Sequence, residues 1–221
     1  MRAPISVIVP TLNAEAALPG CLMALTEGLE TGLIRDLIVS DGGSTDLTPA
    51  LADDWGAEVV SGPPSRGGQL RRGCAAAQGD WLLILHADTQ LAVGWSDVAA
   101  RHLKTRKAGW FRLRFDRGGH VVAAWANLRS RLGLPYGDQG LLLPRALYLE
   151  AGGYLDIPLM EDVALARALR GHLVGLSADA VTSAEKYRKQ GWLWRGSRNL
   201  FLLIRYFGGA SPERLAAAYR R

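Results

Sequence analysis

The sequence predicts an α/β fold in which a mostly parallel central sheet is flanked by helices and followed by a helical C-terminal segment. Short β-branched, apolar runs alternate with helix-forming segments along the first half of the chain. These runs are apolar at successive positions, which is typical of strands covered on both faces. The 221 residues, 48% of them hydrophobic, suffice for one domain with a sizeable core.

The first half predicts four strands and three helices. We expect strands at residues 5–9, 37–40, 58–60 and 81–85, and helices at residues 15–25, 49–55 and 67–77. Pro10 stops the first strand, and Asn13 is placed to cap the first helix. Pro49 is tolerated in the first turn of the second helix.

The pattern is less regular after residue 88. We expect helices at residues 93–103, 121–131 and 161–169, and a short strand at residues 141–143. Residues 109–115 alternate in polarity, which indicates a strand at an exposed edge. We predict one α/β domain over residues 1–184 and a basic amphipathic helical segment over residues 185–221.

Positive charge is concentrated in the C-terminal segment. The formal net charge is +5, and residues 185–221 contribute nine Lys/Arg and two Asp/Glu, a net +7. Residues 1–184 therefore carry 17 basic and 19 acidic residues, a net −2. A nearly neutral main domain argues against a nucleic-acid-binding protein. The basic segment suits an anionic membrane surface or a phosphate-bearing acceptor.

Residues 191–207 predict an amphipathic helix. On a helical wheel, Arg188, Arg195, Arg198 and Arg205 fall within about 100° of one another, and apolar residues occupy most of the remainder. Such a helix packs on the domain, forms a dimer contact or lies in a membrane interface.

Two further features concern the cellular compartment. We expect no signal peptide, because no basic region precedes an apolar one at the N-terminus, and no transmembrane helix, because no apolar run reaches about 18 residues. Cys21 and Cys74 lie in helix-like stretches and predict buried, reduced thiols of a cytoplasmic protein.

Polar loops lie beside four of the predicted strands. They comprise residues 10–15, 41–46, 86–89 and 136–140, and each contains a carboxylate. In an open parallel sheet, ligands bind outside the carboxyl ends of the strands. The loops therefore predict a binding site. No Gly-x-Gly-x-x-Gly follows the first strand and no phosphate-binding Gly-rich loop with Lys exists, which disfavours a dinucleotide-binding protein.

The carboxylates of these loops allow more than one role. Asp41 either closes a turn or accepts hydrogen bonds from a nucleobase or ribose. Asp88 either caps a helix or binds a hard divalent cation, and His86 could ligate the metal, contact ribose or pack. Glu161 and Asp162 either complement the helix dipole or include a general base.

Four motifs resemble those of family 2 glycosyltransferases. They are Ser-Val-Ile-Val-Pro-Thr-Leu-Asn-Ala-Glu at residues 6–15, Ile-Val-Ser-Asp-Gly-Gly-Ser-Thr-Asp at 38–46, Leu-His-Ala-Asp at 85–88 and Glu-Asp at 161–162. The resemblance implies the GT-A fold, a UDP- or GDP-sugar donor, and Mn²⁺ or Mg²⁺ as cofactor. The short length, Arg-Gly-Gly-Gln at residues 66–69 and the Arg-rich tail also resemble the small bacterial transferase 2-like, radical-SAM/selenodomain-associated group.

The resemblance implies roles for single residues. Asp162, beside Glu161, would be the general base of an inverting transfer, and Asp88 the metal ligand. Together with the loop analysis it predicts that substrate is bound by Pro10, Thr11, Asn13, Glu15, Asp41, Gly42, Arg66, Gln69, His86, Ala87, Asp138, Gln139 and Arg188.

The sequence also departs from the family pattern. His86 occupies the place of the first aspartate of Asp-x-Asp, and Arg71 stands where related sequences often carry Asn. No Gln-x-x-Arg-Trp follows, so we do not expect a polymer-making synthase. Two other functions are possible. A nucleotidyltransferase usually has a basic Gly-rich loop after the first strand, and that loop is missing here. A nucleotide-sugar-binding protein without catalysis is favoured by His86 and disfavoured by Asp88, Glu161 and Asp162.

Overall fold

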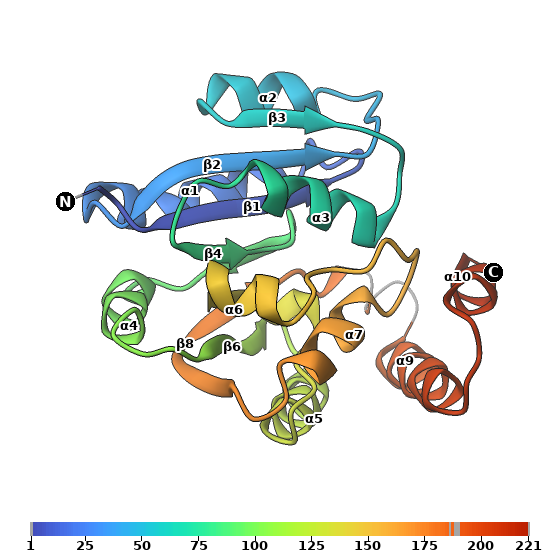
Figure 1. Ribbon diagram of the computed structural model, residues 1–221. Coiled ribbons are helices and arrows are strands. Elements are labelled where there is room, and N and C mark those ends of the chain that lie inside the picture. The colour runs from blue at the N-terminus through green and yellow to red at the C-terminus, as the bar shows by residue number, and fades with distance from the viewer. Residues whose placement is uncertain (1, 186, 188–190, 221) are drawn as a thin grey trace.

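The computed structural model describes residues 2–185, 187 and 191–220, and within them an eight-stranded sheet lies at the centre with helices around it (Figure 1). The strands follow the order β3-β2-β1-β4-β7-β6-β8-β5 across the sheet. They are β1 Ile5–Thr11, β2 Ile34–Asp41, β3 Glu58–Ser61, β4 Trp81–Ile84, β5 Thr89–Leu91, β6 Ala108–Phe115, β7 Leu141–Pro144 and β8 Leu173–Thr182.

Helices cover both faces of this sheet, and two C-terminal helices follow them. They are α1 Leu18–Glu30, α2 Thr48–Asp54, α3 Arg66–Ala76, α4 Trp95–His102, α5 His120–Arg131, the 3₁₀ turn η1 Gly137–Gln139, α6 Arg145–Glu150, α7 Glu161–Ala168, α9 Trp192–Phe207 and α10 Pro212–Arg220. Within the described part of the chain, every helix is too short or too polar to cross a bilayer.

One half of the sheet is parallel and the other is mixed. Strand β1 pairs parallel with β2 and β4, and β2 pairs parallel with β3, as the sequence predicts. In the other half β6 and β8 are parallel, whereas β7 is antiparallel to both β4 and β6, and β5 is antiparallel to β8. Because β7 opposes β4, the segment entering β7 lies at the sheet edge where β4 ends.

Strand alternation builds two core layers. Val7 and Val9 of β1 pack into one cluster with residues of α1 and α4, whereas Ile8 packs into a second cluster with residues of α3 and α6. Successive side chains of a strand point to opposite faces, so a fully apolar strand covered by helices on both faces is stable here. The predicted burial of both thiols is confirmed, because Cys21 belongs to the first cluster and Cys74 to the second.

The C-terminal helices pack on the end of the α/β layers near α7. Leu202 and Leu203 of α9 and Leu215 of α10 form a buried cluster with Met160 and Val163. The predicted packing of the C-terminal segment on the domain is therefore seen. The proposed domain boundary between residues 184 and 185 stays a prediction.

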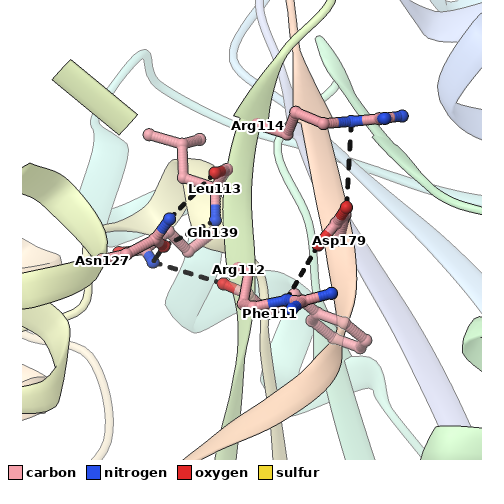
Figure 2. A network of polar contacts seen from close by, with 7 residues as sticks. All are labelled: Phe111, Arg112, Leu113, Arg114, Asn127, Gln139 and Asp179. Carbon is pink, nitrogen blue, oxygen red and sulfur yellow. Dashed lines mark hydrogen bonds and ion pairs between the residues drawn. The ribbon is translucent and has the colours of Figure 1, made fainter. Parts of the chain in front are cut away.

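Strand β6 is not an edge strand, so that prediction was wrong. It lies between β7 and β8, and the edges are formed by β3 and β5. Its alternation arises because Arg112 and Arg114 project from one face, where their Nε atoms lie 2.9 and 3.8 Å from the Asp179 carboxylate of β8 (Figure 2). An interior strand with one exposed face shows the same alternation of polar and apolar residues as a strand at an exposed edge.

Beyond the point where β7 ends, a side-chain amide supplies the hydrogen bonds of the β6 backbone. Strand β7 pairs with only two residues of β6, Gly109 and Trp110. Further along, the Asn127 amide of α5 accepts a hydrogen bond from Leu113 N at 2.8 Å and donates one to Leu113 O at 3.0 Å (Figure 2). The amide thus replaces a strand neighbour, because buried backbone groups need partners.

Several element boundaries differ from the sequence prediction. Helix α1 begins at Leu18 with Ala17 as its N-cap, so the prediction that Asn13 caps it was wrong. Asn13 instead adopts a left-handed conformation (φ 49°) and bonds to the loop after β2. Strand β8, the ten-residue strand beside β6, was not predicted, because Gly175, Ala178 and Ala180 weaken the apolar, β-branched signal of a strand.

Candidate active site

The loops after β1 and β2 are joined by reciprocal hydrogen bonds. Asn13 N donates to Ser44 Oγ at 2.8 Å, and Asn13 Oδ1 accepts from Thr45 N at 2.9 Å. Glu15 Oε2 accepts from Leu47 N at 3.0 Å. Asn tolerates the left-handed backbone that this arrangement requires. Asn13 and Glu15 therefore set the shape of the loops at the carboxyl edge of the sheet.

The Asp41 carboxylate is buried and organises its own loop. It accepts hydrogen bonds from Thr11 Oγ1 at 3.0 Å, from Gly43 N and Ser44 N at 2.8 Å each, and from Ser44 Oγ at 2.5 Å. Burial would raise the pKa of Asp41, but the hydrogen bonds from Ser44, Gly43 and Thr11 together hold the pKa below its usual value. The turn role considered from the sequence is present, and the base-binding role stays a prediction.

Gln69 of α3 braces the same two strand ends. Its Nε2 donates to Thr11 O at 2.6 Å and to Ser40 O at 3.2 Å, and the side chain is buried. A Cβ at Gly42 would lie 2.9 Å from Gln69 Cδ, so a side chain at position 42 would displace this amide. Glycine at this position therefore allows α3 to approach the strand ends.

A cleft of about 740 Å³ opens at this edge of the sheet. This volume lies in the range that small-molecule sites use. The predicted site residues that line it are Pro10, Thr11, Asn13, Arg66, Gln69, His86, Ala87, Asp88 and Glu161. Glu15, Asp41, Gly42 and Gln139 do not line it. Arg188 lies outside the described residues.

A smaller cavity of about 170 Å³ adjoins the cleft and is rich in carboxylates. Asp88, Asp138, Glu161 and Asp162 all line it, and Asp88 and Glu161 line the cleft as well. The two cavities are therefore contiguous at the end of β4. Loops far apart in sequence meet here because η1 enters β7 antiparallel to β4.

The environment of Asp138 is unfavourable to its negative charge. Its Oδ1 atom is buried and has no hydrogen-bond partner among the described residues. Burial raises the pKa of Asp138 to about 6, with smaller contributions from the charges of Asp162 and Asp88 that Arg129 and Arg66 oppose. A cation bound beside these carboxylates would lower the cost of ionising Asp138.

Glu161 and Asp162 are adjacent but differ in environment. Glu161 is 1% exposed, and Arg66 Nε lies 2.9 Å from its Oε1. Burial first and the Asp162 charge second raise the pKa of Glu161 to about 7, against the effect of Arg66. Asp162 is half-buried, and its Oδ2 accepts from Gly137 N at 3.0 Å. Met160, immediately before the pair, has a left-handed backbone (φ 70°), a strained conformation of the kind that functional sites retain.

Asp88 could hold a metal together with a diphosphate. Among the residues that the structure describes, no three His, Cys, Asp or Glu side chains are grouped to bind a metal alone. Mg²⁺ bound to a nucleotide needs only one or two protein carboxylates besides the phosphates. Asp88 lies in both cavities beside three more carboxylates, so the residues fit such a cation.

His86 and the C-terminal helices complete the walls. A Cβ on Gly137 would overlap the His86 imidazole, so the ring packs directly on η1. Arg195 and Asn199 of α9 and Tyr219 of α10 line the smaller cavity, and Tyr219 also lines the cleft. Sequence reasoning did not find Asn199 or Tyr219, because nothing local shows that two C-terminal helices fold back over the strand ends.

The family model described as "Glycosyl transferase family 2" matches residues 6–148. This match extends over more than half of the chain and contains the loops after β1, β2 and β4. The chain belongs to glycosyl transferase family 2. The resemblance inferred from the four motifs is thereby confirmed, and the nucleotidyltransferase alternative is set aside.

Curated relatives of this family 2 glycosyltransferase match it over part of their length. A PGL/p-HBAD biosynthesis glycosyltransferase of Mycobacterium tuberculosis is 37% identical over 99 residues, which cover 41% of this chain and 38% of the relative. Glucosyl-3-phosphoglycerate synthase of the same species is 38% identical over 93 residues, 38% of this chain and 28% of the relative. The chain thus matches well under half the length of these relatives.

Solved structures confirm the GT-A architecture. The crystal structure of S. aureus TarS 1-349 superposes with a TM-score of 0.68 at 16% identity and covers 91% of this chain and 64% of that one. Glucosyl-3-phosphoglycerate synthase from Mycobacterium tuberculosis, in complex with Mn²⁺, UDP and glucosyl-3-phosphoglycerate, superposes with a TM-score of 0.55 at 26% identity. That comparison covers 81% of this chain and 70% of the synthase.

Proposed function

We propose that this glycosyltransferase takes a UDP- or GDP-sugar in the larger cleft and transfers the sugar, with inversion, to an acceptor that enters the smaller cavity. The observation that carries the proposal is the contiguity of the two cavities at Asp88. The first is large enough for a nucleotide and the second holds the carboxylates. A donor and an acceptor can therefore meet at one carboxylate-lined point.

Two comparisons support the nucleotide-sugar donor. S. aureus TarS has been solved with UDP-GlcNAc, and the mycobacterial synthase with UDP and Mn²⁺. In this chain the cleft extends from the hydrogen-bonded loops after β1 and β2 to the end of β4. Thr11 and Asn13 at its rim are polar groups suited to orient a nucleoside.

Asp88 is the proposed ligand of the divalent cation, Mn²⁺ or Mg²⁺. When bound there, the cation would neutralise the negative charge that develops on the departing diphosphate. Arg66 adds a fixed positive charge at the boundary of the two cavities. Its half-exposed guanidinium is held beside Glu161, so it points along the wall that both cavities share.

Asp162 is the proposed general base. Glu161 is 1% exposed and its carboxylate is held by Arg66, whose Nε lies 2.9 Å from Oε1, so Glu161 is already engaged in an ion pair. Asp162 retains access to the smaller cavity and is oriented by Gly137 N. An acceptor hydroxyl in that cavity could lose its proton to Asp162 as it attacks the sugar.

Two further proposals concern the cellular location of the enzyme and the contacts of its C-terminal helix. We propose that it acts in the cytoplasm, where its two buried free cysteines stay reduced. The sequence proposal that the C-terminal helix contacts a membrane or a second copy concerns the exposed face of α9, because its other face packs on α7.

Ligand-induced stabilisation tests the donor and metal proposals. Thermal unfolding should shift upward with UDP or GDP plus Mn²⁺, since ligand at about 100 times its dissociation constant adds about 2.7 kcal/mol of stability. Asp88→Ala should abolish the Mn²⁺-dependent part of the shift. Asp54→Ala, on the exposed surface of α2, is the matched control and should keep it.

Two outcomes would contradict these proposals. If Asp88→Ala keeps the full Mn²⁺ dependence, the metal assignment is wrong. If no nucleoside diphosphate stabilises the wild type with or without Mn²⁺, the donor assignment is wrong.

A further inference from the structure

Helix α5 exposes a stripe of large apolar side chains. Val121, Trp125, Leu128 and the C-cap residue Leu132 are 83%, 52%, 47% and 73% exposed. Their spacing of four, three and four residues places them on one side of the helix. The opposite side is buried through Ala123 and Ala126. The solvent-facing side of α5 is therefore apolar where a surface helix is ordinarily polar.

Helix α9 likewise exposes apolar residues on its solvent-facing side. Its packed side buries Leu202 and Leu203 against the cluster near α7. Its outer side exposes five large apolar residues to between 41% and 69%: Trp194, Leu200, Phe201, Ile204 and Phe207. A helix with one apolar side in the core and another in solvent gains nothing from the second side unless something covers it.

The two stripes belong to one surface. Trp125 of α5 and Leu200 of α9 line the same groove, so the helices lie beside each other at the periphery of the fold (Figure 1). We call the exposed apolar residues of α5, Leu132 and α9 the α5–α9 face. Large exposed apolar residues on two helices that share a groove, with two tryptophans among them, are typical of a protein or membrane contact.

The charged residues around the α5–α9 face indicate which kind of partner it binds. Neither α5 nor α9 contains Asp or Glu, whereas together they contain five arginines, Arg129, Arg131, Arg195, Arg198 and Arg205. Arg131 is exposed, and at about 100° per residue Arg198 and Arg205 lie along one flank of the apolar residues of α9. Arg129, Arg195 and Arg198 are held within the protein by Leu134 O, the Tyr219 hydroxyl and Ala218 O. Arg131 and Arg205 are therefore the arginines that border the apolar residues.

We propose that the α5–α9 face docks on an anionic lipid bilayer. The apolar side chains enter the interfacial region, the tryptophans lie at headgroup level and the arginines meet lipid phosphates. A two-fold contact between copies would bring the arginines of both chains into one interface. Like charges then oppose that dimer, whereas an anionic surface complements them.

Docking would also orient the site described above. Four residues line both the groove between α5 and α9 and the carboxylate-rich cavity: Tyr136, Asp138, Tyr187 and Asn199. The cavity proposed for the acceptor therefore lies directly behind the docking face. The lipid contact is independent of the proposed transfer reaction and is tested without any nucleotide sugar.

Vesicle binding of the full chain tests this inference. Wild-type protein is sedimented with vesicles of phosphatidylglycerol and phosphatidylcholine, and with vesicles of phosphatidylcholine alone, at low and high salt. We expect binding to the anionic vesicles that weakens with salt, because exposed charges are screened. The double variant Phe201→Ser/Ile204→Ser should bind at least about tenfold more weakly, since two interfacial side chains are lost.

A matched control separates the face from general apolar exposure. Met23→Ser/Leu29→Ser removes two apolar residues of α1 that are exposed to a similar degree, at 60% and 55%, and should bind vesicles like the wild type. Circular dichroism verifies that both double variants are folded. Absence of wild-type binding, or equal losses in both variants, would overturn the proposal. So would a dimer, seen by ultracentrifugation, that Phe201→Ser/Ile204→Ser dissociates while vesicles bind neither protein.

Discussion

At the residue scale, two neighbouring carboxylates acquire different chemistry from their surroundings. Both line the smaller cavity, but Glu161 is 1% exposed and paired with Arg66, whereas Asp162 is half-buried and accepts a backbone hydrogen bond from Gly137. Adjacent residues on a helix point about 100° apart, so the two carboxylates reach the smaller cavity from different directions. The geometry favours Asp162 as the base and Glu161 as the residue that positions Arg66.

Asp162→Asn tests this division of roles. The variant keeps the size of the side chain and an oxygen for Gly137 N, but it cannot accept the acceptor proton. Transfer should fall by roughly 10² to 10⁴, the usual range for lost general-base catalysis, while UDP and Mn²⁺ bind as before. Initial rates with an identified donor and calorimetry with UDP measure the two effects separately.

Glu161→Gln is the matched variant at the neighbouring position. It should retain base catalysis and show altered donor affinity, because Arg66 loses its charged partner. If Glu161→Gln is inactive and Asp162→Asn fully active, the base is Glu161. If both remain fully active, neither carboxylate is the base.

At the element scale, a close approach between α3 and the segment before α7 brings Arg66 to Glu161. Gly67 N donates to Ile157 O at 3.1 Å, and Ser65 Oγ donates to Asp156 Oδ1 at 2.6 Å. A Cβ on Gly67 would overlap Leu155 O and lie 2.8 Å from Ile157 N, both backbone atoms that cannot rotate away. Glycine at position 67 is thus a requirement of this packing.

Gly67→Ala should therefore destabilise the fold by about 1–3 kcal/mol, as overpacked sites do. Gly196→Ala in α9 is the control, because among the described residues, apart from its own helix backbone, no atom lies within 4 Å of the new Cβ. It should be neutral or stabilise by up to about 1 kcal/mol through helix propensity. Urea denaturation measures both, and equal effects of the two substitutions would contradict the packing argument.

At the scale of the whole molecule, the C-terminal helices are part of the structure that encloses the site. Tyr219 and Asn199 line cavities whose other walls come from β4, η1 and α7. Leu215 of α10 is fully buried in the cluster that joins these helices to Met160 and Val163. We therefore expect residues 191–220 to unfold together with the α/β layers.

Leu215→Ala should lower the stability of the entire chain by about 2–5 kcal/mol, the range for a buried leucine truncated to alanine. Leu149→Ala, at a position that is 65% exposed, should change it little. Calorimetry should show one transition in each case. A separate low-temperature transition that alone moves in Leu215→Ala would mean that the segment is an independent unit, as the predicted boundary at residue 184 supposes.

Local patterns predicted the first half of the molecule well. The apolar runs that become β1 to β4 and the helices between them lie within a few residues of their expected places. Strands buried on both faces and helix-forming segments carry their signal in neighbouring residues. The loops that follow these strands could therefore be placed at one edge of a parallel sheet, and with them Thr11, Asn13 and Asp88.

The second half could not be predicted as well because its signals are not local. Residues 109–115 looked like an edge strand, yet β8, Asn127 and β7 surround them. Gln139 was expected to bind substrate, but its amide is buried and donates to Phe111 O at 3.2 Å (Figure 2). From the sequence alone, a polar side chain near a strand end that contacts a ligand cannot be distinguished from one that bonds to the protein's own backbone.

The sequence by itself determined the family, the α/β class and the identity of the carboxylates near the strand ends, because motif residues and strand periodicity are contiguous in the chain. Only the tertiary structure decided how these carboxylates differ. The antiparallel return of β7 brings Asp138 beside Asp88 and Asp162, and α3 packs close enough for Arg66 to neutralise Glu161. Burial and charge spacing set the proton affinities of Asp138 and Glu161, and both depend on contacts between residues far apart in the chain.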